Sequence, residues 1–111
     1  MPRDPEVAAA VKATLARLQE LAPGRAVEVR IPPYAAVQAV PGHTHRRGTP
    51  AAVVETDAQT WLALCDGSLT WAAAVHAGRV HASGERSDLS GWLPLSGGPS
   101  TTESVVIPTN G

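Results

Sequence analysis

Residues 56–95 decide the fold and read TDAQTWLALCDGSLTWAAAVHAGRVHASGERSDLSGWLPL. Their first four residues form a capping-box pattern, in which the Thr56 hydroxyl and the Gln59 side chain satisfy free amides at the start of a helix. The apolar residues that follow predict a helix through residue 66, where an Asp-Gly pair ends it. A second short helix, opened by a threonine cap, is expected over residues 71–77.

A strand and a final turn complete the same stretch. Residues 79–83 alternate in the manner of a strand, and Gly84 breaks it. Ser87 or Asp88 is expected to open a last helical turn, which Pro94 ends. This part of the chain therefore predicts two short helices, a strand and a third, very short helix.

The N-terminal half supplies one longer helix and further strands. Asp4 and Pro5 suit the N-cap and the first helical position, and an apolar stripe at spacings of three and four predicts a helix over residues 5–21. Alternating or short apolar runs predict strands at residues 27–31, 34–40 and 51–55. Short helices and strands of this kind indicate one α+β domain.

Composition and charge exclude several classes of function. The 111 residues suffice for one domain, expected over residues 1–95. Nine basic and ten acidic residues give a net charge of -1, so the overall charge does not favour binding to nucleic acids or anionic membranes, which prefer basic stripes. No apolar run approaches the roughly 20 residues that cross a bilayer, and no signal peptide is evident. With a single cysteine and no intrachain disulfide, we expect a cytoplasmic protein without stable membrane insertion.

The composition changes after Leu95. Residues 96–100 (SGGPS) are typical of a flexible linker. Residues 105–107 (VVI) suit an added strand at a sheet edge, in this chain or in a neighbouring one, and a frayed tail is the alternative. Residues 96–111 are therefore expected to form a flexible tail outside the domain.

The order of these parts resembles the sterol carrier protein domain, especially its small stand-alone actinobacterial members. That family has a helix ending in Gly-Lys/Arg/Ser-Leu, found here at residues 67–69, and a second helix ending in a glycine and a basic residue, found at Gly78 and Arg79. A strand and a glycine that leads into the final helix follow at residues 80–84. With the preceding helix and strands, the resemblance covers residues 5–95.

The resemblance implies a mainly antiparallel, five-stranded sheet with short helices packed on one face and an apolar cavity between the layers. Members bind sterols, fatty acids or acyl-CoA esters, and related domains are non-catalytic parts of actinobacterial enzymes. This chain departs from the better-known members because it has no Phe, is short, and ends in Thr109-Asn110-Gly111 instead of a peroxisomal signal. These departures leave the identity of the ligand open.

A ligand site is expected along an apolar wall on the three short helices. The wall residues are Trp61, Leu64, Trp71, Val75, Trp92 and Leu93. Small residues on the sheet opposite this wall, such as Ala36 or Ala52, would leave room for an apolar ligand. The alternative is a core filled by side chains. Arg46 and Arg47 are expected to hold a carboxylate or phosphate at the cavity mouth, unless they belong to a solvated loop.

Catalysis and metal binding find little support in the sequence. His43 and His45 share one side of an extended segment, but no third ligand is nearby, so no metal site and no cofactor are expected. Cys65 lies in an apolar helix segment with no base beside it, which favours a structural role. His76 and His81 are expected to be structural or exposed. Sequence motifs of hydrolases, phosphate-binding loops, dinucleotide-binding proteins and metalloproteases are absent. The sequence does not show whether four carboxylates lie close together in space: Glu55, Asp57, Glu85 and Asp88.

Together with these observations, the resemblance implies a non-catalytic protein that sequesters or transfers a fatty acid, an acyl-CoA ester or a sterol-like lipid. The alternative is an interaction module or enzyme-associated subunit with a filled core, partnered by a second copy or by an enzyme. A small enzyme that uses the loop of residues 43–47 is the weakest hypothesis.

Overall fold

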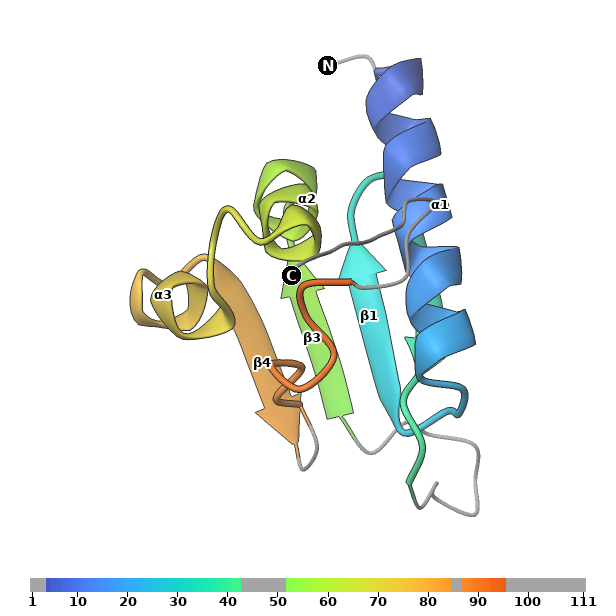
Figure 1. The fold of residues 1–111 in the computed structure, drawn as a ribbon, viewed down its shortest axis with the longest axis vertical. Coiled ribbons are helices and arrows are strands. Elements are labelled where there is room, and N and C mark those ends of the chain that lie inside the picture. Colours follow the sequence, from blue (N-terminus) through green and yellow to red (C-terminus); the bar gives the residue numbers. More distant parts are fainter. Residues whose placement is uncertain (1–3, 43–51, 85–86, 96–111) are drawn as a thin grey trace, which may run out of the picture.

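The computed structural model describes residues 4–42, 52–84 and 87–95. In this part of the chain, three helices and four strands follow one another (Figure 1). Their bounds are α1 Pro5–Leu21, β1 Val27–Ile31, β2 Ala35–Ala39, β3 Ala52–Thr56, α2 Ala58–Asp66, α3 Trp71–His76 and β4 Val80–Gly84. The α+β class expected from the sequence is confirmed.

Helix α1 begins and packs as its sequence predicts. The Asp4 carboxylate accepts hydrogen bonds from the backbone amides of Glu6 and Val7, at 2.9 and 3.4 Å, which caps the helix. The apolar stripe of the helix turns toward the sheet; Val11, Leu15 and Leu18 have no exposed surface, and Val7 is half-buried.

Helix α2 begins one residue later than the capping-box prediction. Asp57 is its N-cap, because the carboxylate accepts the backbone amide of Thr60 at 2.7 Å and the Thr60 hydroxyl at 3.0 Å. Thr56 instead ends β3, and its buried hydroxyl donates to the Arg79 carbonyl at 2.7 Å. The assignment of Thr56 as the cap is therefore wrong.

The sheet differs from the expected five-stranded, mainly antiparallel one. Among the described residues it has four strands in the order β2-β1-β3-β4. The pairs β1–β2 and β3–β4 are antiparallel, whereas the central pair β1–β3 is parallel, so the sheet is mixed. The reason is that β2 returns along one side of β1 and β3 takes the other side in the same direction as β1. The candidate strand at 105–107 lies outside the described residues.

The two faces of the sheet have opposite character. On β1, Val27, Val29 and Ile31 have no exposed surface and point toward the helices, which lie over one face (Figure 1). Glu28 and Arg30 alternate with them on the other face. There the Arg30 guanidinium lies 3.5 Å from the carboxylate of Glu55 on β3. The polar face is therefore solvated, and the core lies between the sheet and the helices.

The segment of residues 87–95 lacks the helical turn predicted for it. The Asp88 carboxylate accepts the Ser90 amide at 2.8 Å, and the Trp92 amide donates to the Leu89 carbonyl at 2.9 Å, so the chain makes turns only. A segment this short, with a glycine at 91 and a proline at 94, does not nucleate a helix. Its buried Leu89 nevertheless completes the core.

A tight corner joins the end of α1 to the end of β2. The Val40 amide donates to the Ala22 carbonyl at 2.6 Å, and the Val40 carbonyl accepts the Ala26 amide at 3.0 Å. Val40 itself adopts a φ of 76°, which a β-branched residue rarely does. Gly24, with a φ of +147°, passes so close that a Cβ there would lie 2.6 Å from the Val40 carbonyl carbon. The corner fixes α1 against the sheet.

Candidate functional site

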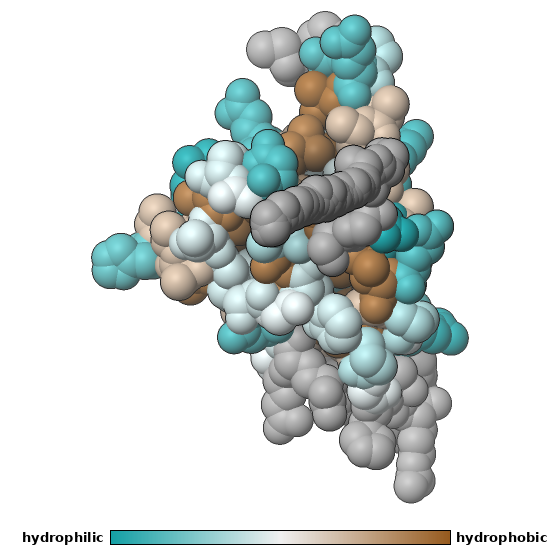
Figure 2. Space-filling view, in the orientation of Figure 1, coloured by the Kyte–Doolittle hydropathy of each residue, from teal (hydrophilic) through white to brown (hydrophobic). Residues whose placement is uncertain are grey.

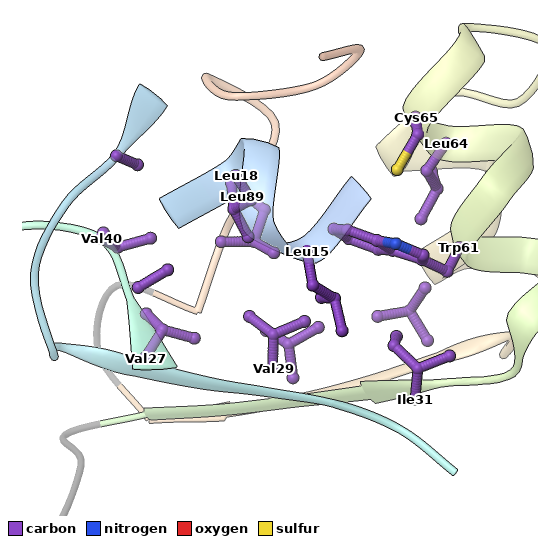
Figure 3. Close-up of a cluster of buried hydrophobic side chains, with 14 of the residues drawn as sticks. Leu15, Leu18, Val27, Val29, Ile31, Val40, Trp61, Leu64, Cys65 and Leu89 are labelled. Carbon is purple, nitrogen blue, oxygen red and sulfur yellow. The ribbon is translucent and has the colours of Figure 1, made fainter. Parts of the chain in front are cut away.

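The space between helices and sheet is occupied by the protein's own side chains. Figure 3 shows Trp61 extending from α2 toward Leu15 of α1, above Val29 and Ile31 of β1. Trp61 has no exposed surface, and Leu64 is 1% exposed. The described part of the core is therefore closely packed at the place where the sequence favoured a cavity.

The buried indole of Trp61 is tied to α1 by a hydrogen bond. Its Nε1 donates to Thr14 Oγ1 at 2.8 Å. The Thr14 hydroxyl in turn donates to the Ala10 carbonyl at 2.7 Å, one turn earlier in the same helix. Because the one polar atom of the indole has its partner, Trp61 fits the interior without an unsatisfied donor.

The six residues of the expected apolar wall do not form one surface. Trp61 and Leu64 lie in the core, whereas Val75 is 43% exposed on α3. The remaining three are half-buried against the core; they are Trp71, Trp92 and Leu93. Trp92 and Leu93 lie on the turns of residues 87–95, so the wall does not rest on three helices.

Three of these residues do meet around a pocket between α2, α3 and the final turns. Leu64, Trp71 and Leu93 line a hollow of about 290 Å³. The other lining residues are Gly67, Leu69, Thr70, Ala72, Ser90 and Pro94. The structure thus brings together half of the expected wall, and the assignment of these residues to a ligand stays a prediction.

A larger hollow, which we call the α1–α2 groove, lies between the two helices. Its volume is about 500 Å³, and its residues are Ala13, Thr14, Ala16, Arg17, Glu20, Leu62, Cys65, Asp66 and Leu95. Figure 2 shows patches of apolar surface among more hydrophilic residues on this face of the molecule. Small alanines on α1 leave the space that bulkier side chains would fill, so the groove has an apolar floor and a charged rim.

Sequence reasoning missed most of the groove. Ala13 and Ala16 lie three residues apart beside the buried stripe of α1, a small-residue pattern that marks the flank of a helix facing a neighbour. Leu62 lies next to Trp61 on α2; it is half-buried, packs against the edge of the core and also lines the groove. The spacing of the two alanines was the sequence signal for a helix flank that faces a neighbour, but it does not identify which element lies opposite.

Leu95 joins the final segment to the groove. Its backbone amide donates to the Cys65 carbonyl at 3.0 Å. This bond satisfies a carbonyl at the end of α2 that has no partner within the helix. The side chain of Leu95 is half-buried at the groove, so the C-terminal end of the described chain forms part of its wall.

Cys65 is protonated at the floor of the groove. The pKa of its thiol is raised from 9.0 to about 12, mainly by burial. A hydrogen bond with Thr14 lowers the pKa by less than burial raises it, and the negative charge of Asp66 raises it further. A thiol is a much weaker nucleophile than a thiolate. Cys65 therefore supplies an apolar surface rather than a reactive group.

Charged residues at the groove rim have partners of their own. The Arg17 guanidinium lies 2.9 Å from the Glu20 carboxylate on the same helix. The Asp66 carboxylate accepts the Ser68 amide at 2.8 Å, and its hydrogen bonds with Ser68 lower the pKa of this carboxyl. These contacts stabilise the local backbone and leave the groove floor apolar.

The other candidate polar residues serve separate structural purposes. Asp57 caps α2, Glu55 faces Arg30 on the outer sheet face, and hydrogen bonds with Ser90 lower the pKa of the Asp88 carboxyl. His76 and His81 are exposed, and His81 lines a hollow of about 500 Å³ along β3 and β4 with Val53, Glu55, Val80, Ala82 and Ser83. In residues 4–42, 52–84 and 87–95, no three His, Cys, Asp or Glu side chains gather as metal ligands.

Several candidates lie outside the described residues: His43, His45, Arg46, Arg47 and Glu85. Their assignments stay predictions. Within the described part of the chain, no helix has the length and apolar character needed to cross a membrane.

Comparison with known proteins identifies the family. No curated protein matches the chain. A family model described as "Bacterial SCP ortholog" matches residues 3–95. This match confirms the resemblance to the sterol carrier protein domain that residues 5–95 carry, and the chain belongs to the bacterial SCP ortholog family.

Proposed function

We propose that the chain binds a fatty acid, an acyl-CoA ester or a sterol-like lipid, and that the α1–α2 groove takes the apolar part of this ligand. The observation that carries the proposal is the groove itself. Its volume of about 500 Å³ falls within the range of roughly 300–1,000 Å³ that is usual for small-molecule sites. Membership of the SCP family supports lipid binding in general.

The groove suits an apolar chain because of what covers its floor. Ala13, Ala16, Leu62 and Leu95 present carbon atoms, and the Cys65 thiol is uncharged. Moving apolar surface out of water contributes about 25 cal/mol per Å², which drives binding without directional contacts. Because Cys65 is protonated and the rim carboxylates have other partners, we propose sequestration or transfer and no chemical step.

The proposed site differs from the cavity between the layers. The buried side chains of Trp61 and Leu64 occupy the space between sheet and helices, so we propose that the ligand binds in a groove at the surface. The hollow lined by Leu64, Trp71 and Leu93 is the second choice, because its 290 Å³ lies at the lower limit for a ligand site. Arg46 and Arg47 remain our candidates for contact with a carboxylate or phosphate head group.

The experiment uses the delipidated full chain and cis-parinaric acid, a fluorescent fatty acid. Ala16→Trp places an indole in the α1–α2 groove, and Ala72→Trp places one in the smaller hollow. Ala9→Trp is the matched control, since Ala9 is exposed on α1 and lines neither of these two hollows. We expect Ala16→Trp to weaken binding by about tenfold or more, which corresponds to about 1.4 kcal/mol, and the other two variants to bind as the parent does.

Two results would contradict the proposal. Loss of binding in Ala72→Trp alone would move the ligand to the smaller hollow. Absence of binding in the parent, with cis-parinaric acid and with an acyl-CoA ester, would remove the function itself. Thermal unfolding of each variant shows whether the fold has survived.

The closely packed core favours a second candidate, an interaction module. Trp61 is completely buried, and its indole is hydrogen-bonded to Thr14, as expected for a solid core. Val75, 43% exposed on α3, is the position at which we test contact with a partner. Light scattering of the delipidated chain tests this candidate: a dimer that Val75→Asp dissociates would support it, and a monomer would exclude self-association.

A further inference from the structure

We propose that the charges at the rim of the α1–α2 groove make it selective for lipids with an uncharged head group, such as an alcohol, over lipids with a carboxylate. Asp66 is the residue that sets this preference. The inference rests on the proposed function, because it names the class of lipid that the same groove favours. Fatty acids would still enter the groove, but with lower affinity than uncharged lipids of the same chain length.

The described residues that line the groove carry more negative than positive charge. Arg17, Glu20 and Asp66 are the charged ones, one basic and two acidic. The Arg17 guanidinium lies 2.9 Å from the Glu20 carboxylate, so these two charges offset each other. Asp66 therefore leaves this part of the rim with one negative charge in excess.

The Asp66 carboxylate is held in place at the end of α2. It accepts the Ser68 amide at 2.8 Å, and its hydrogen bonds with Ser68 lower its pKa, so it is ionised at neutral pH. Both ion pairs between described residues involve other carboxylates. No cation in the described part of the chain therefore offsets the charge that Asp66 presents to the groove.

The helix backbones add to this negative potential. α1 and α2 line the groove with residues from their C-terminal halves, and the C-terminal end of a helix carries partial negative charge. Basic side chains stabilise such an end, yet the last turn of neither helix contains one. An acidic residue lies near each end instead, Glu20 in α1 and Asp66 in α2. A head group at this rim therefore meets a potential that repels anions.

The floor of the groove does not distinguish between lipids by their charge. Ala13, Ala16 and Leu62 take an apolar chain out of water in the same way whatever head group it carries. The difference arises at the rim, where Asp66 is exposed and its charge is screened by water and salt. Exposed charges at close range change an equilibrium by about two- to fivefold, so we expect a moderate preference.

The test compares three ligands that share one chain and differ in charge: dodecanoic acid, dodecanol and dodecylamine. Each displaces Nile red, an uncharged dye, from the delipidated full chain. Asp66→Asn removes the charge and keeps an oxygen that accepts the Ser68 amide. Glu28→Gln is the matched control, since it removes the same charge from the sheet face that the helices leave uncovered.

We expect Asp66→Asn to strengthen binding of the acid about threefold, to weaken binding of the amine about threefold and to leave the alcohol unchanged. Glu28→Gln should bind all three ligands as the parent does. The parent should bind the alcohol more tightly than the acid, and added sodium chloride should reduce the effect of Asp66→Asn. Thermal unfolding shows that both variants keep the fold.

The outcomes separate this inference from the proposed function. Equal affinities in Asp66→Asn and Glu28→Gln would overturn the inference, although binding by the parent would uphold the function. Tighter binding of the acid than of the alcohol by the parent would also overturn it, and would favour Arg46 or Arg47 as the head-group contact. If the parent binds none of the three ligands, the proposed function fails and the inference fails with it.

Discussion

The indole Nε1 of Trp61 and the hydroxyl of Thr14 lie 2.8 Å apart, and this hydrogen bond joins α2 to α1 across the interior. Trp61 is the largest side chain that is completely buried. Thr14 lies on the opposite side of the contact, where it also lines the α1–α2 groove. One threonine thus links the packing of the core with the floor of the proposed site.

Replacing Thr14 by Val should destabilise the protein by about 1–3 kcal/mol, because the buried Nε1 of Trp61 would lose its acceptor. The valine has nearly the same shape, so packing changes little. Urea unfolding, followed by tryptophan fluorescence, measures the effect. Thr14→Ser keeps the hydroxyl and should cost clearly less; equal stability of Thr14→Val and the parent would show that the bond contributes nothing.

The thiol of Cys65 should make the protein less stable at alkaline pH. Its pKa is 9.0 without burial and about 12 in the fold, so between these values the folded state binds more protons than the unfolded state. The free energy of unfolding therefore falls with rising pH from about 9 to about 12, by at most about 1.4 kcal/mol per pH unit. Below pH 9 this contribution is complete.

Urea unfolding of the parent and of Cys65→Ala across this pH range isolates that contribution. The alanine variant is less stable below pH 9 because of lost packing, and the difference between the two curves should shrink as the pH rises from about 9 toward about 12. Parallel curves would mean that burial does not raise the pKa of the thiol.

A methyl group at position 24 should be poorly tolerated. Gly24 has a φ of +147°, and a Cβ there would approach the Val40 carbonyl carbon to 2.6 Å. Backbone strain of this kind costs about 1–3 kcal/mol, and the clash adds to it. Gly24→Ala should therefore lower the midpoint of thermal unfolding markedly. Gly91→Ala is the control, because a Cβ there meets no atom within 4 Å and should leave the midpoint almost unchanged.

Removing the carboxylate of Asp57 should weaken the start of α2. Asp57→Ala leaves the Thr60 amide without its acceptor, which typically costs about 1 kcal/mol. Asp57→Asn retains an acceptor oxygen and should restore most of the stability in urea unfolding. If both variants unfold at the same urea concentration as the parent, the cap is not formed in solution.

Local sequence patterns predicted the elements better than their arrangement. The cap at Asp4 and the apolar stripe gave the bounds of α1, and alternation located β1, because these signals depend on neighbouring residues only. The choice between Thr56 and Asp57 as the cap of α2 was wrong because the Thr56 hydroxyl finds the Arg79 carbonyl, a partner far away in sequence. The parallel pairing of β1 with β3 likewise depends on the course of a connection and not on either strand.

The candidate site was harder to predict for the same reason. The apolar pattern of α2 predicted that Trp61 and Leu64 contact other apolar groups. Only the three-dimensional structure shows that α1 covers them and that they fill the core. The α1–α2 groove needs Ala13 and Ala16 from one helix, Leu62 from another and Leu95 from the end of the fold. No local pattern specifies that these three segments meet.

The place of β1 in the sheet has a consequence for synthesis on the ribosome. β1 lies between β2 and β3, and β3 follows β2 in sequence. A nascent chain that has emerged only as far as Ala39 can form the β1–β2 hairpin, but the other edge of Val27–Ile31 has no partner until residues 52–56 leave the exit tunnel. Unpaired strand edges recruit other chains, and charged side chains beside an edge oppose this; on this strand Glu28 and Arg30 supply such charges during that interval.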